Sequence, residues 1–85
     1  MKIKRNNKLP WRVIDDTVYI VNPASSYLYS LNPLGRRIWD LISKPVTLEF
    51  IIDKLYSEYD VDKETLKDDI EEFFRIMGTH HLIAN

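Results

Sequence analysis

The sequence predicts an α+β domain in which a three-stranded antiparallel sheet is followed by three helices. Two observations lead to this prediction. Three runs rich in β-branched and aromatic residues lie within the first 31 residues, with turn-forming residues between them. Three segments with apolar residues at helical spacing follow, each preceded by a residue that caps helices. A chain of 85 residues is long enough for one such domain.

The first half of the chain contains the predicted strands. Trp11–Ile14 and Thr17–Asn22 are separated by Asp15-Asp16, which predicts a tight hairpin. A second turn leads into a third strand, Ser26–Leu31. Because short turns join consecutive strands, we expect an antiparallel meander with the third strand at an edge of the sheet.

Each predicted helix has a recognisable start. Asn32 and Pro33 suit the cap and first position of a helix that ends before Lys44-Pro45, while Thr47 and Asp62 cap two further helices. The expected apolar faces are Leu34, Ile38, Leu41 and Ile42 in the first helix, Leu48, Ile51, Ile52, Leu55 and Tyr59 in the second, and Leu66, Ile70, Phe73, Phe74 and Met77 in the third. Three helices beside a small sheet form a winged helix-turn-helix-like arrangement.

The end of the third helix is expected at a glycine. We predict that Gly78 lets the helix fray and that Leu82 and Ile83 then pack back on the core.

Charge is unevenly distributed along the chain. Four basic residues lie in the first eight positions, whereas the rest of the chain carries eight basic and 13 acidic residues. We therefore predict a basic, flexible N-terminal tail over residues 1–10 and a single acidic domain over residues 11–85.

Composition indicates where the protein works. The chain has no cysteine, which suits a reducing compartment. Met1–Lys8 is polar and is followed by no apolar run, so it does not resemble a signal peptide, and no stretch approaches the roughly 20 apolar residues of a membrane span. We expect a cytoplasmic protein without membrane contact.

No pattern in the sequence is typical of catalysis or metal binding. His80 and His81 are adjacent, so on a helix they point about 100° apart and chelate one metal poorly. The carboxylate pairs are also adjacent residues and do not converge on one substrate. With only two glycines, no phosphate-binding loop forms. We predict no catalytic residue, no metal site and no cofactor.

The two outer strands differ in how they are protected from pairing with another chain. Trp11–Ile14 carries Arg12 and follows Pro10, whereas Ser26–Leu31 contains neither charge nor proline. An unprotected edge suggests that a partner strand adds to the sheet, which is the β-augmentation mode of peptide recognition. The alternative is that the third helix or a second copy covers this edge.

The run from Tyr27 to Ile42 (YLYSLNPLGRRIWDLI) resembles the core of the PqqD-like family, the peptide chaperones of pyrroloquinoline quinone biosynthesis and related precursor-recognition elements. An aromatic strand ending in Leu-Asn is followed by a small residue and then by Ile-Trp. The rest of the pattern is similar in Tyr59–Asp62, Asp69-Ile70, Phe73-Phe74 and Leu82-Ile83. One position departs from it, because His81 stands where the family often has glycine.

The resemblance implies a stand-alone peptide-binding protein rather than an enzyme. Family members bind the leader of a ribosomally synthesised precursor peptide as a strand added beside the third strand. They present it to a modifying enzyme such as a radical enzyme using S-adenosylmethionine (radical SAM), a cyclase or a protease. We therefore expect a precursor leader and such an enzyme as partners, and no nucleic acid.

Periodicity and the resemblance together predict the peptide-binding residues. Tyr27, Tyr29 and Leu31 share one face of the strand, with Leu31 expected in the core and the tyrosines near the groove; Leu28 and Ser30 share the other. Only one flank of the third helix can face this strand, and the spacing does not decide which. The predicted binding residues are Tyr27, Leu28, Tyr29, Ser30 and Leu31 on the strand and Lys63, Lys67, Ile70 and Phe74 on the helix.

Two other functions fit the predicted fold. A winged helix-turn-helix protein often binds DNA, but the third helix carries six acidic and three basic residues between Asp62 and Arg75, a charge that phosphates repel. A dimerising scaffold is the other alternative, because the unprotected strand and the exposed aromatic residues suit self-association as a homodimer.

Overall fold

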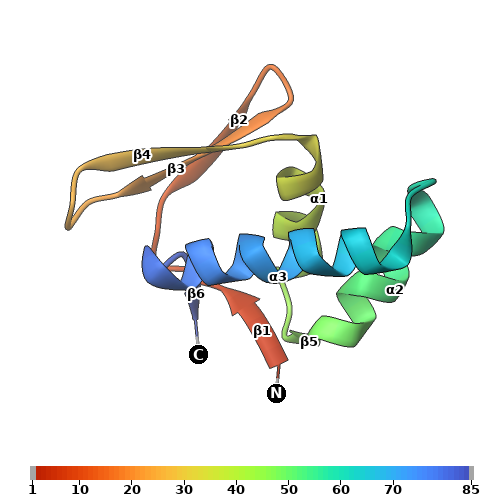
Figure 1. The fold of residues 1–85 in the computed structure, drawn as a ribbon. Coiled ribbons are helices and arrows are strands. Elements are labelled where there is room, and N and C mark those ends of the chain that lie inside the picture. The colour runs from red at the N-terminus through yellow and green to blue at the C-terminus, as the bar shows by residue number, and fades with distance from the viewer. Residues whose placement is uncertain (1, 85) are drawn as a thin grey trace.

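The computed structural model describes residues 2–84 and is α+β, as predicted (Figure 1). Within these residues it contains three helices and six strands. The strands are β1 (Lys2–Arg5), β2 (Trp11–Ile14), β3 (Thr17–Asn22), β4 (Tyr27–Leu31), β5 (Val46–Thr47) and β6 (Ile83–Ala84). The helices are α1 (Pro33–Leu41), α2 (Leu48–Glu58) and α3 (Lys63–Thr79).

Strands β2, β3 and β4 form the predicted antiparallel meander, with β3 in the centre and β4 at an edge. The two-residue turn between β2 and β3 has positive φ at both Asp15 and Asp16 (50° and 64°). Turns of this kind match the twist of paired strands, and aspartate tolerates the conformation better than most residues. The prediction that the third strand lies at the edge of this sheet is confirmed.

The helices begin at the predicted capping residues. The side chain of Asn32 accepts a hydrogen bond from the Gly35 amide at 2.8 Å. Thr47 and Asp62 accept equivalent bonds from amides three residues further on, both at 3.1 Å. Each bond satisfies one of the backbone donors that the first turn of a helix leaves unpaired, so local sequence fixes where all three helices start.

The core lies between the inner face of the β2–β3–β4 sheet and the three helices. Val18 and Ile20 of β3 and Trp39 of α1 are fully buried in this core. The third helix contributes Leu66, Ile70, Phe74 and Met77. Phe73 was expected in the core and Phe74 beside the groove, but Phe74 is buried in the core, whereas Phe73 is only half-buried and lies at the edge of the core.

The prediction of a flexible tail over residues 1–10 is wrong for Lys2–Arg5, which form β1. This strand pairs antiparallel with β5 on one side and β6 on the other. Ile3 packs against the core, and the Arg5 guanidinium lies 4.7 Å from the ring centroid of Trp11 and 5.4 Å from that of Trp39. The charges of this segment suggested a solvated tail, but a cation over aromatic rings is itself a packing contact. Met1 lies outside the described residues.

The end of α3 is closed by two backbone hydrogen bonds. The Leu82 amide donates to the Met77 carbonyl at 2.9 Å, and the His81 amide donates to the Gly78 carbonyl at 3.2 Å. This is the Schellman pattern, in which a left-handed residue turns the following amide back toward the helix, and His81 has φ 61°. The helix continues through Gly78 to Thr79, so the predicted fraying at Gly78 is wrong. Leu82 packs back into the core as expected.

The histidine at this left-handed position generates a stability prediction. We expect His81→Gly to raise the free energy of unfolding by about 1 kcal/mol, because glycine adopts positive φ without the steric cost that a Cβ imposes. His81→Ala removes the same exposed imidazole but keeps the Cβ, and should leave stability unchanged or lower. Urea denaturation measures both variants, and equal stability of the two would contradict this explanation.

Candidate functional site

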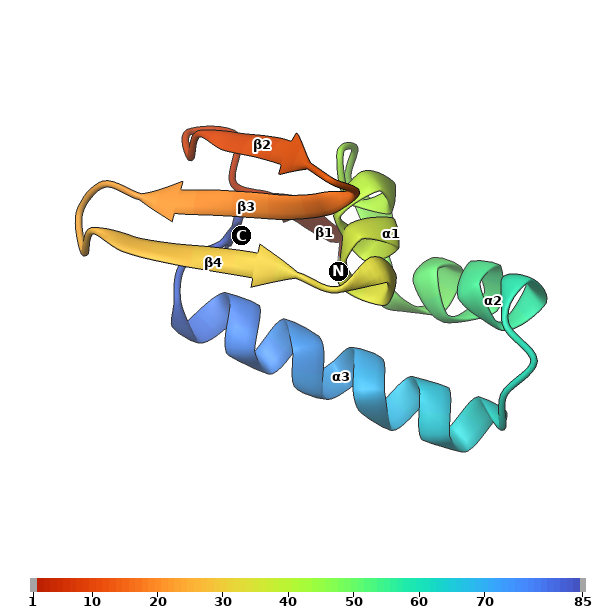
Figure 2. The same cartoon turned by 90° about the horizontal axis from the view of Figure 1, so that it is seen from above.

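A groove runs between β4 and α3 on the open side of the sheet. The helix passes alongside β4 with its C-terminal end near the start of the strand (Figure 2). The groove has a volume of about 390 Å³. It is lined by Leu28, Tyr29, Ser30, Leu31 and Asn32 on the strand side and by Phe73, Ile76, Met77 and Leu82 on the other. We refer to it as the β4–α3 groove.

The backbone of β4 is divided between its neighbour and the open edge. On β3, the Val21 amide donates to the Pro10 carbonyl at 3.0 Å, so the backbone groups of Val21 face β2. Backbone groups alternate in direction along a strand, so those of Ile20 face β4, where Ile20 is paired with Tyr29. Tyr29 therefore uses its amide and carbonyl within the sheet. The amides and carbonyls of Leu28 and Ser30 point outward at the groove.

The side chains of β4 divide in the same alternating way. Leu31 is buried in the core, as predicted. Tyr29 is half-buried and lines the groove, with its ring centroid 5.1 Å from that of His80 at the end of α3. Tyr27 is 63% exposed and lies beside Tyr29, with 6.2 Å between ring centroids. The inner face of this strand is thus aromatic toward its start and aliphatic toward its end.

The flank of α3 that was expected to face β4 faces elsewhere. The Lys63 ammonium lies 3.3 Å from a carboxylate oxygen of Asp53 on α2, and Lys67 is exposed. Ile70 is fully buried and Phe74 is 9% exposed, both within the core. None of Lys63, Lys67, Ile70 and Phe74 is among the residues that line the β4–α3 groove. The structure therefore does not bring these four predicted helix residues to the groove.

The opposite flank of α3 borders the groove, and Gly35 lets this flank approach α1 closely. A Cβ at position 35 would lie 3.2 Å from both the Phe73 ring and the Leu31 Cβ, closer than packed carbon atoms normally come. Phe73 therefore packs over α1 at the floor of the groove, and Ile76 stands on its rim, 45% exposed. Ile76 is an apolar residue outside the core-facing arc of a helix whose other outer residues are mostly charged. This feature of the sequence could have predicted that its flank faces the groove.

The acidic residues of α3 are partly neutralised by neighbours on the same helix. Glu72 accepts a hydrogen bond from Arg75 Nε at 2.9 Å. This bond holds the pKa of the Glu72 carboxyl below its usual value and raises the pKa of Arg75. Lys67 pairs with Glu71 at 3.9 Å. Asp69, on the flank that faces the groove, has no ion-pair partner within residues 2–84.

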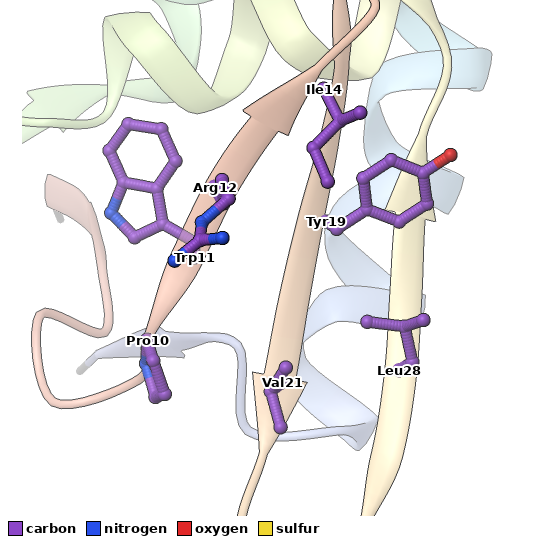
Figure 3. A pocket seen from close by; sticks show the side chains of 7 residues that line it. All are labelled: Pro10, Trp11, Arg12, Ile14, Tyr19, Val21 and Leu28. Atoms are coloured by element: carbon purple, nitrogen blue, oxygen red, sulfur yellow. The ribbon is translucent and has the colours of Figure 1, made fainter.

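A second hollow lies on the outer face of the sheet (Figure 3). Its volume is about 420 Å³, and it is lined by Pro10, Trp11, Arg12, Ile14, Tyr19, Val21 and Leu28. Leu28 also lines the β4–α3 groove, so the two hollows meet at β4. Neighbouring aliphatic side chains from three strands are exposed on this face and form a continuous apolar patch. Such a patch is larger than the single exposed apolar residues found on most surfaces, and it is typical of an interaction surface.

The described part of the chain offers little for metal chemistry. Across residues 2–84, no three histidine, aspartate or glutamate side chains come together as metal ligands would. Within the same range, no helix has the length and apolarity needed to cross a lipid bilayer.

The fold and the groove define a small peptide-recognition type of domain, in which an unpaired strand edge lies beside an apolar flank of a helix. The family model for coenzyme PQQ synthesis protein D (PqqD) matches residues 17–83, and this chain belongs to that family. No curated protein matches the sequence significantly. Among solved structures, TbiB1 in complex with the TbiA(beta) leader peptide is similar, with a TM-score of 0.86 and 28% sequence identity over 96% of this chain and 95% of that one.

Proposed function

We propose that this protein is a recognition element that captures the leader of a ribosomally synthesised precursor peptide and has no catalytic activity of its own. The single observation that carries the proposal is the outward-facing backbone of Leu28 and Ser30 beside the β4–α3 groove. An extended peptide gains main-chain hydrogen bonds at such an edge and side-chain specificity from the adjoining groove. The similarity to TbiB1, which was solved with a leader peptide, supports this assignment.

The geometry of the edge indicates how a leader would lie. Leader residues opposite Tyr29 and Leu31 would turn their side chains inward, because residues opposite one another in a sheet share a face. There they would contact Phe73 and Ile76 of α3, which lie across the groove. Leader residues opposite Leu28 and Ser30 would turn outward. A leader with apolar residues at alternating positions fits this arrangement.

The proposed site combines predicted residues with others that the sequence did not indicate. The strand residues Tyr27, Leu28, Tyr29, Ser30 and Leu31 remain in it. On the helix side, Phe73, Ile76, Met77 and Leu82 take the place of Lys63, Lys67, Ile70 and Phe74. Recognition then depends on apolar contact and backbone pairing more than on the lysines.

Binding of this kind couples folding of the leader to recognition. Ordering a disordered segment costs about 2–5 kcal/mol, so the affinity must come from a few well-buried anchor residues. Dissociation constants from micromolar to nanomolar are expected for such complexes, which correspond to binding free energies of about −8 to −12 kcal/mol.

The captured leader would be presented to a cytoplasmic modifying enzyme, such as a radical SAM enzyme, a cyclase or a protease. Tethering raises the concentration of the core peptide near the enzyme without any new contact to it. The outer face of the sheet around Ile14 and Val21 stays free when a strand occupies the β4 edge, and is available to the enzyme or to a second copy of the chain.

Blocking the outward amide of Ser30 tests the backbone pairing. We expect Ser30→Pro to weaken leader binding at least tenfold, because proline removes one edge donor and is tolerated where the amide faces away from the sheet. Ser30→Ala keeps the amide and should bind within about twofold of the unmodified protein. Fluorescence polarisation with a labelled N-terminal segment of the precursor encoded beside the gene measures both. Equal affinities, with circular dichroism showing both variants folded, would contradict β-augmentation.

A pair of alanine variants tests which flank of α3 faces the leader. Ile76→Ala should weaken binding about fivefold to tenfold, since burying a side chain of this size contributes about 1 kcal/mol or more at an interface. Lys67→Ala, on the opposite flank, should leave the affinity unchanged. The same polarisation assay decides, and a larger loss for Lys67→Ala would return the site to the flank that the sequence favoured.

A further inference from the structure

The apolar surface beside β4 does not stop where the strand ends. A third, smaller cavity of about 90 Å³ lies between the start of α1 and the first half of α3. It is lined by Leu34, Tyr59, Val61, Thr65, Leu66 and Asp69. We refer to it as the α1–α3 pocket.

The α1–α3 pocket and the β4–α3 groove lie on one flank of the same helix. Thr65, Asp69, Phe73 and Ile76 recur at the three- and four-residue spacing that places side chains in a single stripe. Figure 2 shows that β4 leads directly into α1 while α3 runs alongside both. A peptide strand paired with β4 that continues beyond Leu31 would pass on the solvent side of the contact between Phe73 and α1 and reach the pocket.

Two apolar side chains at the rim of this pocket are exposed to solvent. Val61 and Tyr59, in the link between α2 and α3, are 45% and 37% exposed. Two large apolar side chains beside a cavity cost free energy in water unless something covers them. The cavity is small, so it suits a single aliphatic side chain.

Charge indicates what lies next to that side chain. Asp69 lines the pocket and has no ion-pair partner within residues 2–84, whereas Glu71 and Glu72 are paired with Lys67 and Arg75. Asp69 is thus the acid that a ligand crossing from the groove to the pocket would meet without a competing protein cation. A basic residue complements it.

We propose that the α1–α3 pocket is a second anchor subsite for the same leader, and that the leader carries lysine or arginine between its two apolar anchors. This inference rests on the leader-binding function proposed above. The α3 residues of the two hollows are centred about nine residues, or about 13 Å, apart along the helix, a distance that about four residues of extended chain span. An even spacing keeps both anchors on the inward face, with the basic residue midway between them.

Selection from a phage-displayed library of random 12-residue peptides, at about 50 mM salt, tests the proposal on the full chain. The targets are the unmodified protein, Asp69→Lys and the matched control Asp68→Lys. The control makes the same charge change one residue away, on a part of α3 that lines neither hollow. Leu28→Pro, which blocks the β4 edge, is the fourth target.

The unmodified protein and Asp68→Lys should enrich peptides with apolar residues about four positions apart and lysine or arginine between them. Asp69→Lys should enrich aspartate or glutamate there instead. For a synthetic peptide with the selected sequence, replacing the basic residue by glutamate should weaken binding to the unmodified protein about threefold to fivefold, as expected for an exposed ion pair. The same replacement in the peptide should strengthen its binding to Asp69→Lys.

Two results separate failure of this inference from failure of the proposed function. The second subsite is overturned if enrichment is lost in Leu28→Pro but the selected peptides show no charge preference. It is also overturned if Asp68→Lys and Asp69→Lys shift the charge preference of the selected peptides equally. Leader binding stays in place in both cases. No enrichment on the unmodified protein over a bare support, or equal enrichment on Leu28→Pro, overturns both.

Discussion

A strand at the edge of a sheet pairs on one side only, and everything proposed for this protein depends on how β4 divides its backbone. Tyr29 faces β3, so the amides and carbonyls of Leu28 and Ser30 are left at the open side. Such groups carry a cost when they are buried without partners and attract another strand when they are exposed. The chain protects its other outer strand with Arg12 and a preceding proline, but leaves this one unprotected.

The open edge becomes a selective site only because α3 lies beside it at a fixed distance. Near the middle of the helix, Phe73 packs close to α1 at Gly35, where a Cβ would leave little room. The C-terminal end is held by the Schellman closure and by β1, to which Asn6 adds a bond from its amide to the Leu82 carbonyl at 3.0 Å. The N-terminal residues are therefore part of the frame of the groove, since β1 pairs directly with β6 after α3.

Local signals in the sequence were sufficient for most of the fold. The hairpin at Asp15-Asp16 and the caps at Asn32, Thr47 and Asp62 depend on residues within a few positions of each other, so they could be predicted without knowing the tertiary structure. β1 could not, because its partners β5 and β6 are two-residue strands far away in the chain, with no pattern of their own. The strand side of the proposed site was expected from the unprotected edge and the family resemblance, and alternation divided its side chains between the two faces. The helix side could not be predicted in this way, because helical spacing alone does not decide which apolar residues of α3 pack into the core and which border the groove.

Amide hydrogen exchange of β4, followed by NMR with and without a saturating leader peptide, tests the central claim most directly. In the free protein, the Tyr29 amide should exchange slowly because it is bonded to β3, while the Leu28 and Ser30 amides should exchange rapidly. Addition of the leader should slow exchange at Leu28 and Ser30 and change Tyr29 little. If the leader binds and these two amides still exchange as fast as in the free protein, the peptide does not add to this edge and the account is wrong.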